Sequence, residues 1–184
     1  AITRALALDR SNTIFITYSH SSEKGQLMER EFDNVNSLKC DFTNSTEVTS
    51  LVNNIRRMNI DALVNNAYSN SCIKTYFNKV PAESFALDFT NNIIPTIRIT
   101  QEVITEFRRK KSGKIITILT SGLVNTPPLG WSCYTANKAY LASLVKSWAI
   151  ENIKYNISSN SVSPGFMQTN LTSDVDERII DQMI

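Results

Sequence analysis

The sequence lacks the features that mark membrane-spanning, secreted and metal-binding proteins. Its 184 residues contain no apolar run long enough to cross a bilayer and no secretory signal. Its three cysteines, Cys40, Cys72 and Cys133, are odd in number and lack the spacing of metal ligands. They indicate free thiols in a reducing compartment. We therefore expect a cytoplasmic protein with neither a membrane segment nor a metal site.

The sequence also lacks a strong excess of charge, and it has a single histidine. It carries 19 basic and 17 acidic residues, so its net charge of +2 indicates no nucleic acid or other polyanionic partner. His20 is more simply interpreted as a solvated loop residue than as a catalyst. There is no internal repeat, and a hydrophobic fraction of 42% is ordinary for a globular protein. At this length we expect a single domain over residues 1–184.

Strand-like and helix-like segments alternate along the chain. Short runs of apolar and β-branched residues predict strands at residues 13–18, 61–67, 114–119 and, more weakly, 37–41. Helix-forming residues and apolar spacings of three and four predict helices at residues 1–8, 23–32, 45–55, 93–107 and 135–151. Residues 157–163 are too polar to predict as a strand. The alternation favours an α/β fold with a parallel sheet covered on both faces.

Three features of the sequence are expected to mark helix ends. Ser22 is a candidate N-cap for the helix at 23–32. The cations at residues 108–111 suit the C-terminus of the helix at 93–107, and Gly113 suits its stop.

Polar residues lie at the carboxyl ends of the predicted strands. Ser19, Asp41, Asn66 and Ser121 each stand at or just after such an end. In doubly wound parallel sheets, ligands bind in the crevice outside the carboxyl ends of the strands. The pattern therefore predicts a cofactor cleft along one edge of the sheet.

Tyr134 and Lys138 are four residues apart near the start of the last predicted helix, which places both side chains on one face. A phenol with its ordinary pKa of about 10 is a poor acid or base at neutral pH. An ammonium within roughly 4–6 Å favours the phenolate and lowers that pKa. The pair is therefore a candidate acid/base unit. Since this spacing also arises by chance on a helix surface, the interpretation depends on other motifs.

Several motifs taken together resemble the classical short-chain dehydrogenase/reductase family. They are the stretch DALVNNA at residues 61–67, Ser121 thirteen residues before Tyr134, then Lys138, and Pro164-Gly165 followed by Thr169. The resemblance runs from residue 1 to about residue 174, and within the family the sequence most resembles bacterial 3-oxoacyl-carrier-protein reductases and their relatives. It implies a Rossmann-type doubly wound parallel sheet in a three-layer α/β/α arrangement.

The resemblance assigns catalytic roles to four residues. Tyr134 matches the acid/base, and Lys138 matches the lysine that lowers its pKa and binds the nicotinamide ribose. Ser121 matches the serine that hydrogen-bonds the substrate carbonyl. Asn92 matches the asparagine whose backbone holds a water in the proton relay, with Asn91 as the competing choice. The implied reaction transfers a hydride from a nicotinamide to a carbonyl carbon while Tyr134 protonates the oxygen.

The resemblance also implies contacts with the cofactor. In addition to Tyr134 and Lys138, the matching residues are Ser19, Asp41, Phe42, Asn66, Ala67, Pro164, Gly165, Met167 and Thr169. Asn65 is expected to tie strands together rather than to touch the ligand. No carboxylate follows the strand at 13–18 before Glu23, and a carboxylate there would bond the ribose 2′-hydroxyl of NAD. NADP(H) is therefore favoured, and NAD(H) is possible.

The chain departs from the family pattern in three places. The glycine-rich phosphate loop and the first strand are absent, and so is the C-terminal strand that usually follows a helix such as the one expected at 177–184. We therefore expect a fragment of a longer protein, truncated at both ends. Tyr68 replaces the glycine usual after Asn-Asn-Ala.

Two main classes of function are open at this point, and a sugar epimerase or dehydratase that uses the same Tyr-Lys pair is a third option. The first is an NADP(H)-dependent oxidoreductase that interconverts a carbonyl and an alcohol, with a 3-oxoacyl thioester as one candidate substrate. The alternative is a non-catalytic dinucleotide-binding sensor or scaffold on the same fold. The expected partners are a small-molecule or carrier-linked carbonyl substrate and further copies of the chain, as a dimer or tetramer through the helices at 93–107 and 135–151. The cations at 108–111 are a candidate docking site for an acidic carrier, and Pro127, Pro128 and Trp131 are candidates for the substrate mouth.

Overall fold

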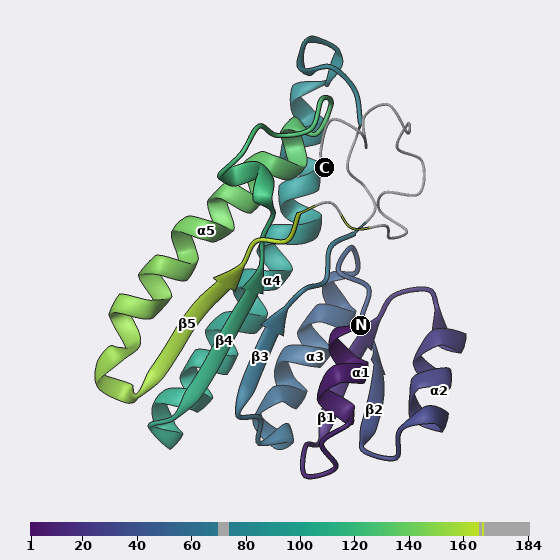
Figure 1. Ribbon diagram of the computed structural model, residues 1–184, viewed down its shortest axis with the longest axis vertical. Helices are drawn as coiled ribbons and strands as arrows, with labels where there is room; N and C mark the ends of the chain where they lie inside the picture. Colours follow the sequence, from purple (N-terminus) through teal and green to yellow (C-terminus); the bar gives the residue numbers. More distant parts are fainter. Residues whose placement is uncertain (70–73, 166, 168–184) are drawn as a thin grey trace. The chain divides into compact units, whose positions relative to one another are not determined.

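The computed structural model describes residues 1–69, 74–165 and 167, and it divides into two compact units (Figure 1). Unit 1 comprises residues 1–53, and unit 2 comprises the described residues from 54 onward. The expected cofactor contact Thr169, the thiol Cys72 and the helix expected at 177–184 lie outside the described residues.

Unit 1 is a two-stranded parallel sheet with helices around it. Its elements are α1 (Ile2–Ala7), β1 (Ile14–Tyr18), α2 (Ser22–Glu31), β2 (Val35–Lys39) and the first part of α3 (Ser45–Met58). The strands pair in register from Ile14 opposite Val35 to Tyr18 opposite Lys39. The Cys40 amide continues the ladder by donating to the Tyr18 carbonyl over 2.8 Å. The carboxyl ends of β1 and β2 therefore lie together.

The start of α3 follows from its capping residue. The side-chain oxygen of Asn44 accepts hydrogen bonds from the amides of Thr46 and Glu47 over 3.0 and 3.3 Å. These amides have no partner within the helix, so the side chain satisfies them. Val48 then turns into the core with 1% exposure. The cap and the apolar spacing explain why this helix was predictable.

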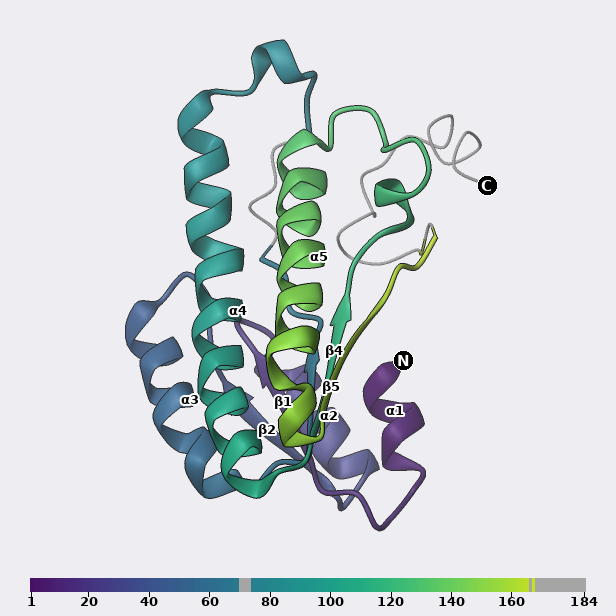
Figure 2. The ribbon, with the colours of Figure 1, turned by 90° about the vertical axis from the view of Figure 1, so that its left-hand side faces the viewer.

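Unit 2 contains a three-stranded parallel sheet in the order β3-β4-β5. Its strands are β3 (Ala62–Asn65), β4 (Gly113–Ile118) and β5 (Ile157–Val162), and its long helices are α4 (Ala82–Lys110) and α5 (Ser132–Asn152). Short 3₁₀ turns complete it: η1 (Phe77–Lys79), η2 (Ser121–Leu123) and η3 (Ile153–Tyr155). Figure 2 shows α4 and α5 side by side against one face of the sheet. β4 is the central strand of this sheet.

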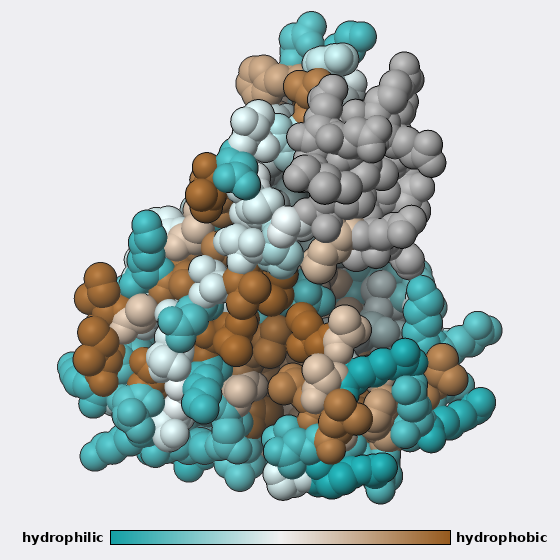
Figure 3. Space-filling view, viewed as in Figure 1, coloured by the Kyte–Doolittle hydropathy of each residue, from teal (hydrophilic) through white to brown (hydrophobic). Residues whose placement is uncertain are grey.

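The core of unit 2 lies between the sheet and these two helices. Ile93, Val103 and Phe107 of α4 and Ile115 of β4 are fully buried there. Apolar residues also gather over β4 and β5 on the other face of the sheet, in the view of Figure 3. Along β4 the burial alternates, so Ile115 and Thr117 face the helices whereas neighbouring side chains face the opposite way.

The junction between α4 and β4 is set by one glycine. Lys111 takes the left-handed conformation with φ 55°, and the Ser112 amide donates to the Phe107 carbonyl over 3.2 Å. The helix stop is therefore Lys111, and Gly113 is the first residue of β4 rather than the expected stop. A Cβ on Gly113 would lie 2.0 Å from the Phe107 ring, which only glycine avoids.

The structure differs from the sequence-based expectations in three further elements. α4 begins at Ala82, eleven residues earlier than predicted. β5 forms at Ile157–Val162 despite its polar sequence, because every residue pairs with β4. The N-cap position of α2 is Ser21 rather than Ser22, and its side chain makes no capping bond. Across the described ranges, none of the helices is both long enough and apolar enough to cross a membrane.

Candidate functional site

The carboxyl ends of β4 and β5 bring Ser121 and Pro164 together. Backbone bonds continue past the strands: the Leu119 amide donates to the Val162 carbonyl, and the Ser121 amide donates to the Pro164 carbonyl, each over 2.8 Å. The Ser121 carbonyl accepts from the amides of the two residues that follow η2, so the turn is fixed by its own backbone. The half-buried Ser121 side chain is therefore held at the edge of the sheet where sequence reasoning placed it.

Lys138 extends from α5 to the end of β4. Its Nζ donates to the Ile118 carbonyl over 2.6 Å and lies 5.5 Å from the centre of the Tyr134 ring. The side chain is 4% exposed, and this burial lowers the pKa of Lys138 to about 8, because desolvation disfavours the charged amine. The two residues share one face of α5, as their spacing predicted. The structure thus places a poorly solvated amine beside a phenol.

Asn92 is engaged on three sides. Its side-chain nitrogen donates to the backbone carbonyl and to Oδ1 of Asp88, both over 3.0 Å. Its side-chain oxygen accepts from the Ser69 amide over 2.5 Å, and its carbonyl accepts from the Thr96 hydroxyl over 2.8 Å. The bond to Ser69 ties α4 to the turn after β3, and Asn92 is 1% exposed. Pro95 lacks an N–H, so the carbonyl of Asn91 loses its helical donor.

The turn after β3 contains a group that sequence reasoning did not assign to the site. The hydroxyl of Tyr68 donates to Oδ2 of Asp88 over 2.6 Å. The side-chain amide of Asn137 donates to the same oxygen over 2.8 Å and to the Tyr68 hydroxyl over 3.3 Å. Asp88 and Asn137 are 2% and 6% exposed. The only signal in the sequence was Tyr68 itself, in place of a glycine, because Asp88 lies in the part of α4 that was not predicted.

Tyr134 lies between two other aromatic rings. Its ring centre is 5.1 Å from that of Tyr68 and 5.3 Å from that of Trp131, both edge-on. Lys138 Nζ lies over the Tyr68 ring at 5.1 Å, and Lys74 Nζ lies over the Trp131 ring at 5.0 Å. Edge-on pairs and cations over ring faces are both favourable arrangements. Three rings and two amines therefore form one continuous cluster around the candidate acid/base.

Asn65 and the turn beside it separate into a structural and an open part. The side-chain amide of Asn65 donates to the hydroxyl of Thr100 on α4 over 3.1 Å and to that of Thr117 on β4 over 3.5 Å. This confirms that it ties elements together. Asn66 and Ala67 are exposed at the carboxyl end of β3.

The segment after β5 carries Gly165 and Met167, two of the expected cofactor contacts. Among the described residues, a Cβ on Gly165 would meet nothing within 4 Å, and Met167 is 52% exposed.

An apolar groove of about 460 Å³ opens on a different face of α5. Its helical lining residues are Ser132, Thr135, Ala136 and Ala139, whose spacing of three and four gathers them on a face that excludes Tyr134 and Lys138. The loop residues that line it are Pro127, Pro128, Leu129, Gly130 and Trp131, joined by Tyr76 and Phe77. The three candidates for the substrate mouth thus border this groove, and among them Trp131 also contacts Tyr134.

The expected cofactor residues of unit 1 lie at the carboxyl ends of its two strands. Ser19 is exposed after β1, and Asp41 follows β2 with the half-buried Phe42 beside it. Oδ1 of Asp41 accepts hydrogen bonds from the backbone amide and the hydroxyl of Thr43, over 2.9 and 2.8 Å. The hydrogen bond from the backbone amide is the main cause of the lowered pKa of Asp41. Oδ2 lies 3.5 Å from Nε2 of His20. Half of this carboxylate is thus committed to a local turn.

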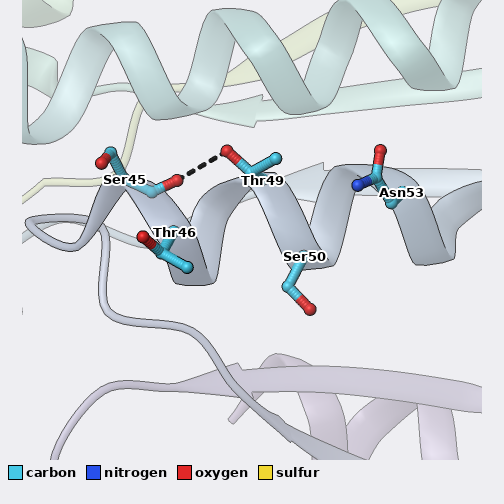
Figure 4. A pocket seen from close by; sticks show the side chains of 5 residues that line it. All are labelled: Ser45, Thr46, Thr49, Ser50 and Asn53. Carbon is cyan, nitrogen blue, oxygen red and sulfur yellow. Dashed lines mark hydrogen bonds between the residues drawn. The ribbon is translucent and has the colours of Figure 1, made fainter.

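Unit 1 also carries a shallow polar groove of about 380 Å³ along α3. Figure 4 shows its lining, which is Ser45, Thr46, Thr49, Ser50 and Asn53. The Thr49 hydroxyl donates to the Ser45 carbonyl over 2.7 Å, so part of this lining is bonded to its own helix. It resembles a solvated helix face rather than a site.

Comparison with known proteins matches residues 1–179 to the family model described as short chain dehydrogenase. Among curated proteins, the chain is 31% identical over 150 residues to carbonyl reductase family member 4 of Xenopus laevis, covering 80% of this chain and 62% of that protein. It is 27% identical over 166 residues to a 3-oxoacyl-[acyl-carrier-protein] reductase of Rickettsia prowazekii, covering 90% of this chain and 66% of that protein. The chain thus spans less than two thirds of either relative.

Solved structures agree on the fold. An acetoin dehydrogenase from Enterobacter cloacae superposes with a TM-score of 0.80 at 25% identity, covering 95% of this chain and 71% of that one. A structure described as a short chain dehydrogenase/reductase family protein gives 0.82 at 23% identity, covering 94% and 72%. The predicted Rossmann-type α/β fold is confirmed by these likenesses.

Proposed function

The chain belongs to the short chain dehydrogenase family, and we propose that the protein is an NADP(H)-dependent oxidoreductase that interconverts a carbonyl and an alcohol. The observation that supports this most directly is the arrangement of Lys138, which is buried, bonded to the end of β4 and within 5.5 Å of the Tyr134 ring. An ammonium in this position favours the phenolate, so that the Tyr134 phenol can exchange its proton with a carbonyl oxygen near neutral pH.

The described residues of unit 2 fit the nicotinamide half of such a cofactor. An ammonium has three donors, and Lys138 bonds the Ile118 carbonyl with one, which leaves donors for ribose hydroxyls. The turn at Asn66 and Ala67 is exposed, and among the described residues none crowds Gly165, which suits the approach of a flat group. When bound, the cofactor supplies the hydride. The proposed contacts otherwise follow the residues named from the sequence.

The chemistry proposed for the chain's own residues is a proton transfer. Tyr134 gives its phenolic proton to the carbonyl oxygen in reduction and recovers it in oxidation. Ser121 donates a hydrogen bond to the same oxygen and stabilises the charge that develops there. The Lys138 ammonium favours the phenolate, so that Tyr134 can give up its proton near neutral pH. Asn92 holds α4 against the turn after β3, and its assigned contact with a relay water stays part of the proposal.

The substrate is proposed at the level of its reacting group. The curated relatives named above are a carbonyl reductase family member and an acyl-carrier-protein reductase, so a small carbonyl compound and a 3-oxoacyl thioester are both candidates. The cations at 108–111 give little support to carrier docking. Arg108 bonds Asn152 and lies over Tyr155, while Arg109 pairs with Glu106.

Lys110 pairs with Asp61, and the four cations at residues 108–111 lie just before β4. Ser121 follows the other end of that strand, which a six-residue strand places roughly 20 Å away. Three of the four cations at residues 108–111 are thus engaged within the chain, at the end of the sheet that does not carry Ser121.

Self-association is proposed through α4 and α5. Large apolar side chains stay exposed on both helices, including Leu87 and Ile94 on α4 and Tyr140 and Ile150 on α5. The Phe89 and Tyr140 rings, 5.0 Å apart, join the two helices into one surface. A second copy would bury this surface. Sedimentation of the full-length protein tests the proposal, and a strict monomer at micromolar concentration would contradict it.

The test of the activity uses the full-length protein with a panel of carbonyl compounds and 3-oxoacyl thioesters, each with NADPH and with NADH. We expect oxidation of NADPH that depends on the carbonyl compound and is lost in Tyr134→Phe. The alternative is a non-catalytic dinucleotide-binding sensor or scaffold on the same fold. Tight binding of either cofactor without turnover of any compound would establish that alternative.

A further inference from the structure

We infer that Tyr68 is a positioning residue for the acid/base pair: Asp88 and Asn137 anchor its hydroxyl, and its ring supports the Lys138 ammonium and the Tyr134 phenol. The inference rests on the proposed function for its catalytic meaning. Its structural part concerns an interaction between a ring and an amine, which can be measured without a cofactor or substrate.

The anchor of Tyr68 is buried and specific. Asp88 is 2% exposed, and its carboxylate accepts hydrogen bonds from Tyr68, Asn137 and Asn92. A buried carboxylate without such donors would be costly, so the three bonds hold one another in place. The donors come from three segments: the turn after β3, α4 itself and α5. Tyr68 therefore cannot rotate away without leaving a buried charge with one donor fewer.

The ring of Tyr68 connects this anchor to the acid/base pair. Its centre lies 5.1 Å from Lys138 Nζ and 5.1 Å from the centre of the Tyr134 ring. The face of an aromatic ring carries negative charge and attracts a cation, most strongly where water is excluded. Lys138 is 4% exposed, so water does not supply that stabilisation. A phenol that donates to a carboxylate also gains electron density in its ring, which strengthens the attraction.

The network places opposite charges at the two ends of one side chain. Asp88 bonds the hydroxyl of Tyr68, and Lys138 lies over the ring of the same residue. The carboxylate and the ring face both favour the charged amine, whereas burial disfavours it and lowers its pKa to about 8. Among the described groups that face Lys138, Tyr134 is the other titratable one. Tyr68 therefore helps to keep the amine charged at the pH where Tyr134 has to act.

The experiment measures the pKa of Lys138 by NMR on protein labelled with ¹³C at the lysine ε-carbon, without cofactor or substrate. The Lys138 signal is identified by its loss in Lys138→Met. Tyr68→Leu removes the ring while keeping apolar bulk, and Tyr68→Phe removes the hydroxyl while keeping the ring. Tyr76→Leu, at a tyrosine that is 60% exposed and lines the groove, is the matched control.

We expect the pKa of Lys138 to fall by roughly 0.5 to 1.5 pH units in Tyr68→Leu, by less in Tyr68→Phe, and not at all in Tyr76→Leu. An unchanged or raised pKa in Tyr68→Leu, or equal shifts in the Leu and Phe variants, would overturn the inference. Should Tyr68→Leu fail to fold, Asp88→Asn takes its place. Removing the buried negative charge must also lower the pKa of Lys138, and an unchanged value there would equally overturn it.

The catalytic part of the inference has its own readout. For any carbonyl compound that the full-length protein reduces, kcat should fall in the order parent, Tyr68→Phe, Tyr68→Leu, and the alkaline limb of the pH profile should move to lower pH in that order. A protein that reduces no compound refutes the proposed function but leaves the NMR result standing. Turnover in the parent with an unshifted Lys138 pKa in Tyr68→Leu refutes the role of Tyr68 alone.

Discussion

The Nζ of Lys138 donates a hydrogen bond to the backbone carbonyl of Ile118 over 2.6 Å, and this bond fixes α5 to the end of the central strand of unit 2. The consequence is electrostatic as well as structural. A carbonyl oxygen offers partial negative charge but cannot replace the water that a surface lysine has, so the pKa of Lys138 falls to about 8. The charge that is proposed to act on Tyr134 is therefore lost at only mildly alkaline pH.

The first prediction concerns the pH dependence of carbonyl reduction. We expect kcat/KM in the full-length protein to be highest below about pH 8 and to fall above it, because loss of the Lys138 proton removes the charge beside Tyr134. The measurement is a pH profile with a saturating cofactor. A profile that stays flat to about pH 10, the region of an ordinary lysine pKa, would contradict the assignment of the limb to Lys138.

The second prediction concerns stability. The pKa of Lys138 is lower in the folded state than the ordinary 10.5, so between about pH 8 and 10.5 the unfolded chain holds a proton that the folded chain has released. The free energy of unfolding therefore rises with pH across this window, and the cost of burying the ammonium, roughly 3 kcal/mol, is fully present below it. The advantage of Lys138→Met over the parent should be largest below pH 8 and shrink toward pH 10.5.

A difference between variants is needed because a second group titrates in the opposite sense. Burial raises the pKa of the Cys40 thiol to about 11, so above about pH 9 it contributes a loss of stability as pH rises. Cys40 is present in the parent and in Lys138→Met, and its contribution cancels when denaturant unfolding of the two is subtracted. A difference that does not vary between about pH 7 and 10.5 would show that Lys138 is not desolvated.

The parts of the fold that the sequence predicted are those with local signals. β4 is a run of apolar and β-branched residues, and the long helices α4 and α5 repeat apolar residues at three and four. β5 was missed because Ser158 to Ser161 have little strand propensity, and pairing with β4 decides their structure. The first turns of α4 were missed because Asn91 and Asn92, which have low helix propensity, interrupt the pattern that continues on both sides of them.

The site divides in the same way. The spacing of Tyr134 and Lys138 is local, and the structure places them together as expected. The bond between Ser121 and Pro164 and the contact of Tyr68 with Asp88 join residues far apart in the sequence, so no spacing rule gives them. The catalytic and cofactor roles stay predictions, as do the single domain over 1–184 and the cytoplasmic location.

The third prediction concerns the junction of α4 and β4. Gly113→Ala would place a Cβ 2.0 Å from the ring of Phe107, which is fully buried, so the ring has to move or the strand has to shift. We expect a loss of about 1–3 kcal/mol in the free energy of unfolding, and more if the strand cannot shift. Gly165→Ala is the matched control, because its Cβ would meet no atom of the described residues within 4 Å. Equal stability of the two variants would show that the junction is looser than the structure indicates.

The fourth prediction separates the roles of the acid/base pair. Tyr134→Phe should lower kcat by about 10²–10⁴-fold or more and leave cofactor binding nearly unchanged, since the hydroxyl acts only when a proton moves. Lys138→Ala should lower both kcat and cofactor affinity, because the amine is proposed to bind the ribose as well as to support the phenol. Steady-state kinetics and fluorescence titration with NADPH provide the two readouts. Wild-type turnover in Tyr134→Phe would remove Tyr134 from the mechanism.

The last prediction concerns the choice of dinucleotide. Ser19 is exposed directly after β1, and no carboxylate stands in the chain between it and Glu23, so nothing in this segment repels a 2′-phosphate. A carboxylate also lies beside His20, with Oδ2 of Asp41 3.5 Å from its Nε2, so this side chain adds little net positive charge to the segment. The preference for NADP(H) thus depends mainly on the absence of repulsion at residues 17–20. Ser19→Asp should weaken NADPH binding and leave NADH binding nearly unchanged.

His20→Gln serves as the control, and it should have a smaller effect on NADPH, since Asp41 already offsets the imidazole charge. The measurement is the ratio of the two dissociation constants at fixed ionic strength, because contacts with a phosphate are screened by salt. Equal or tighter binding of NADH by the full-length wild type would reverse the cofactor assignment. The reductase proposal would survive that result, since it depends on Tyr134, Lys138 and Ser121 rather than on the 2′-position.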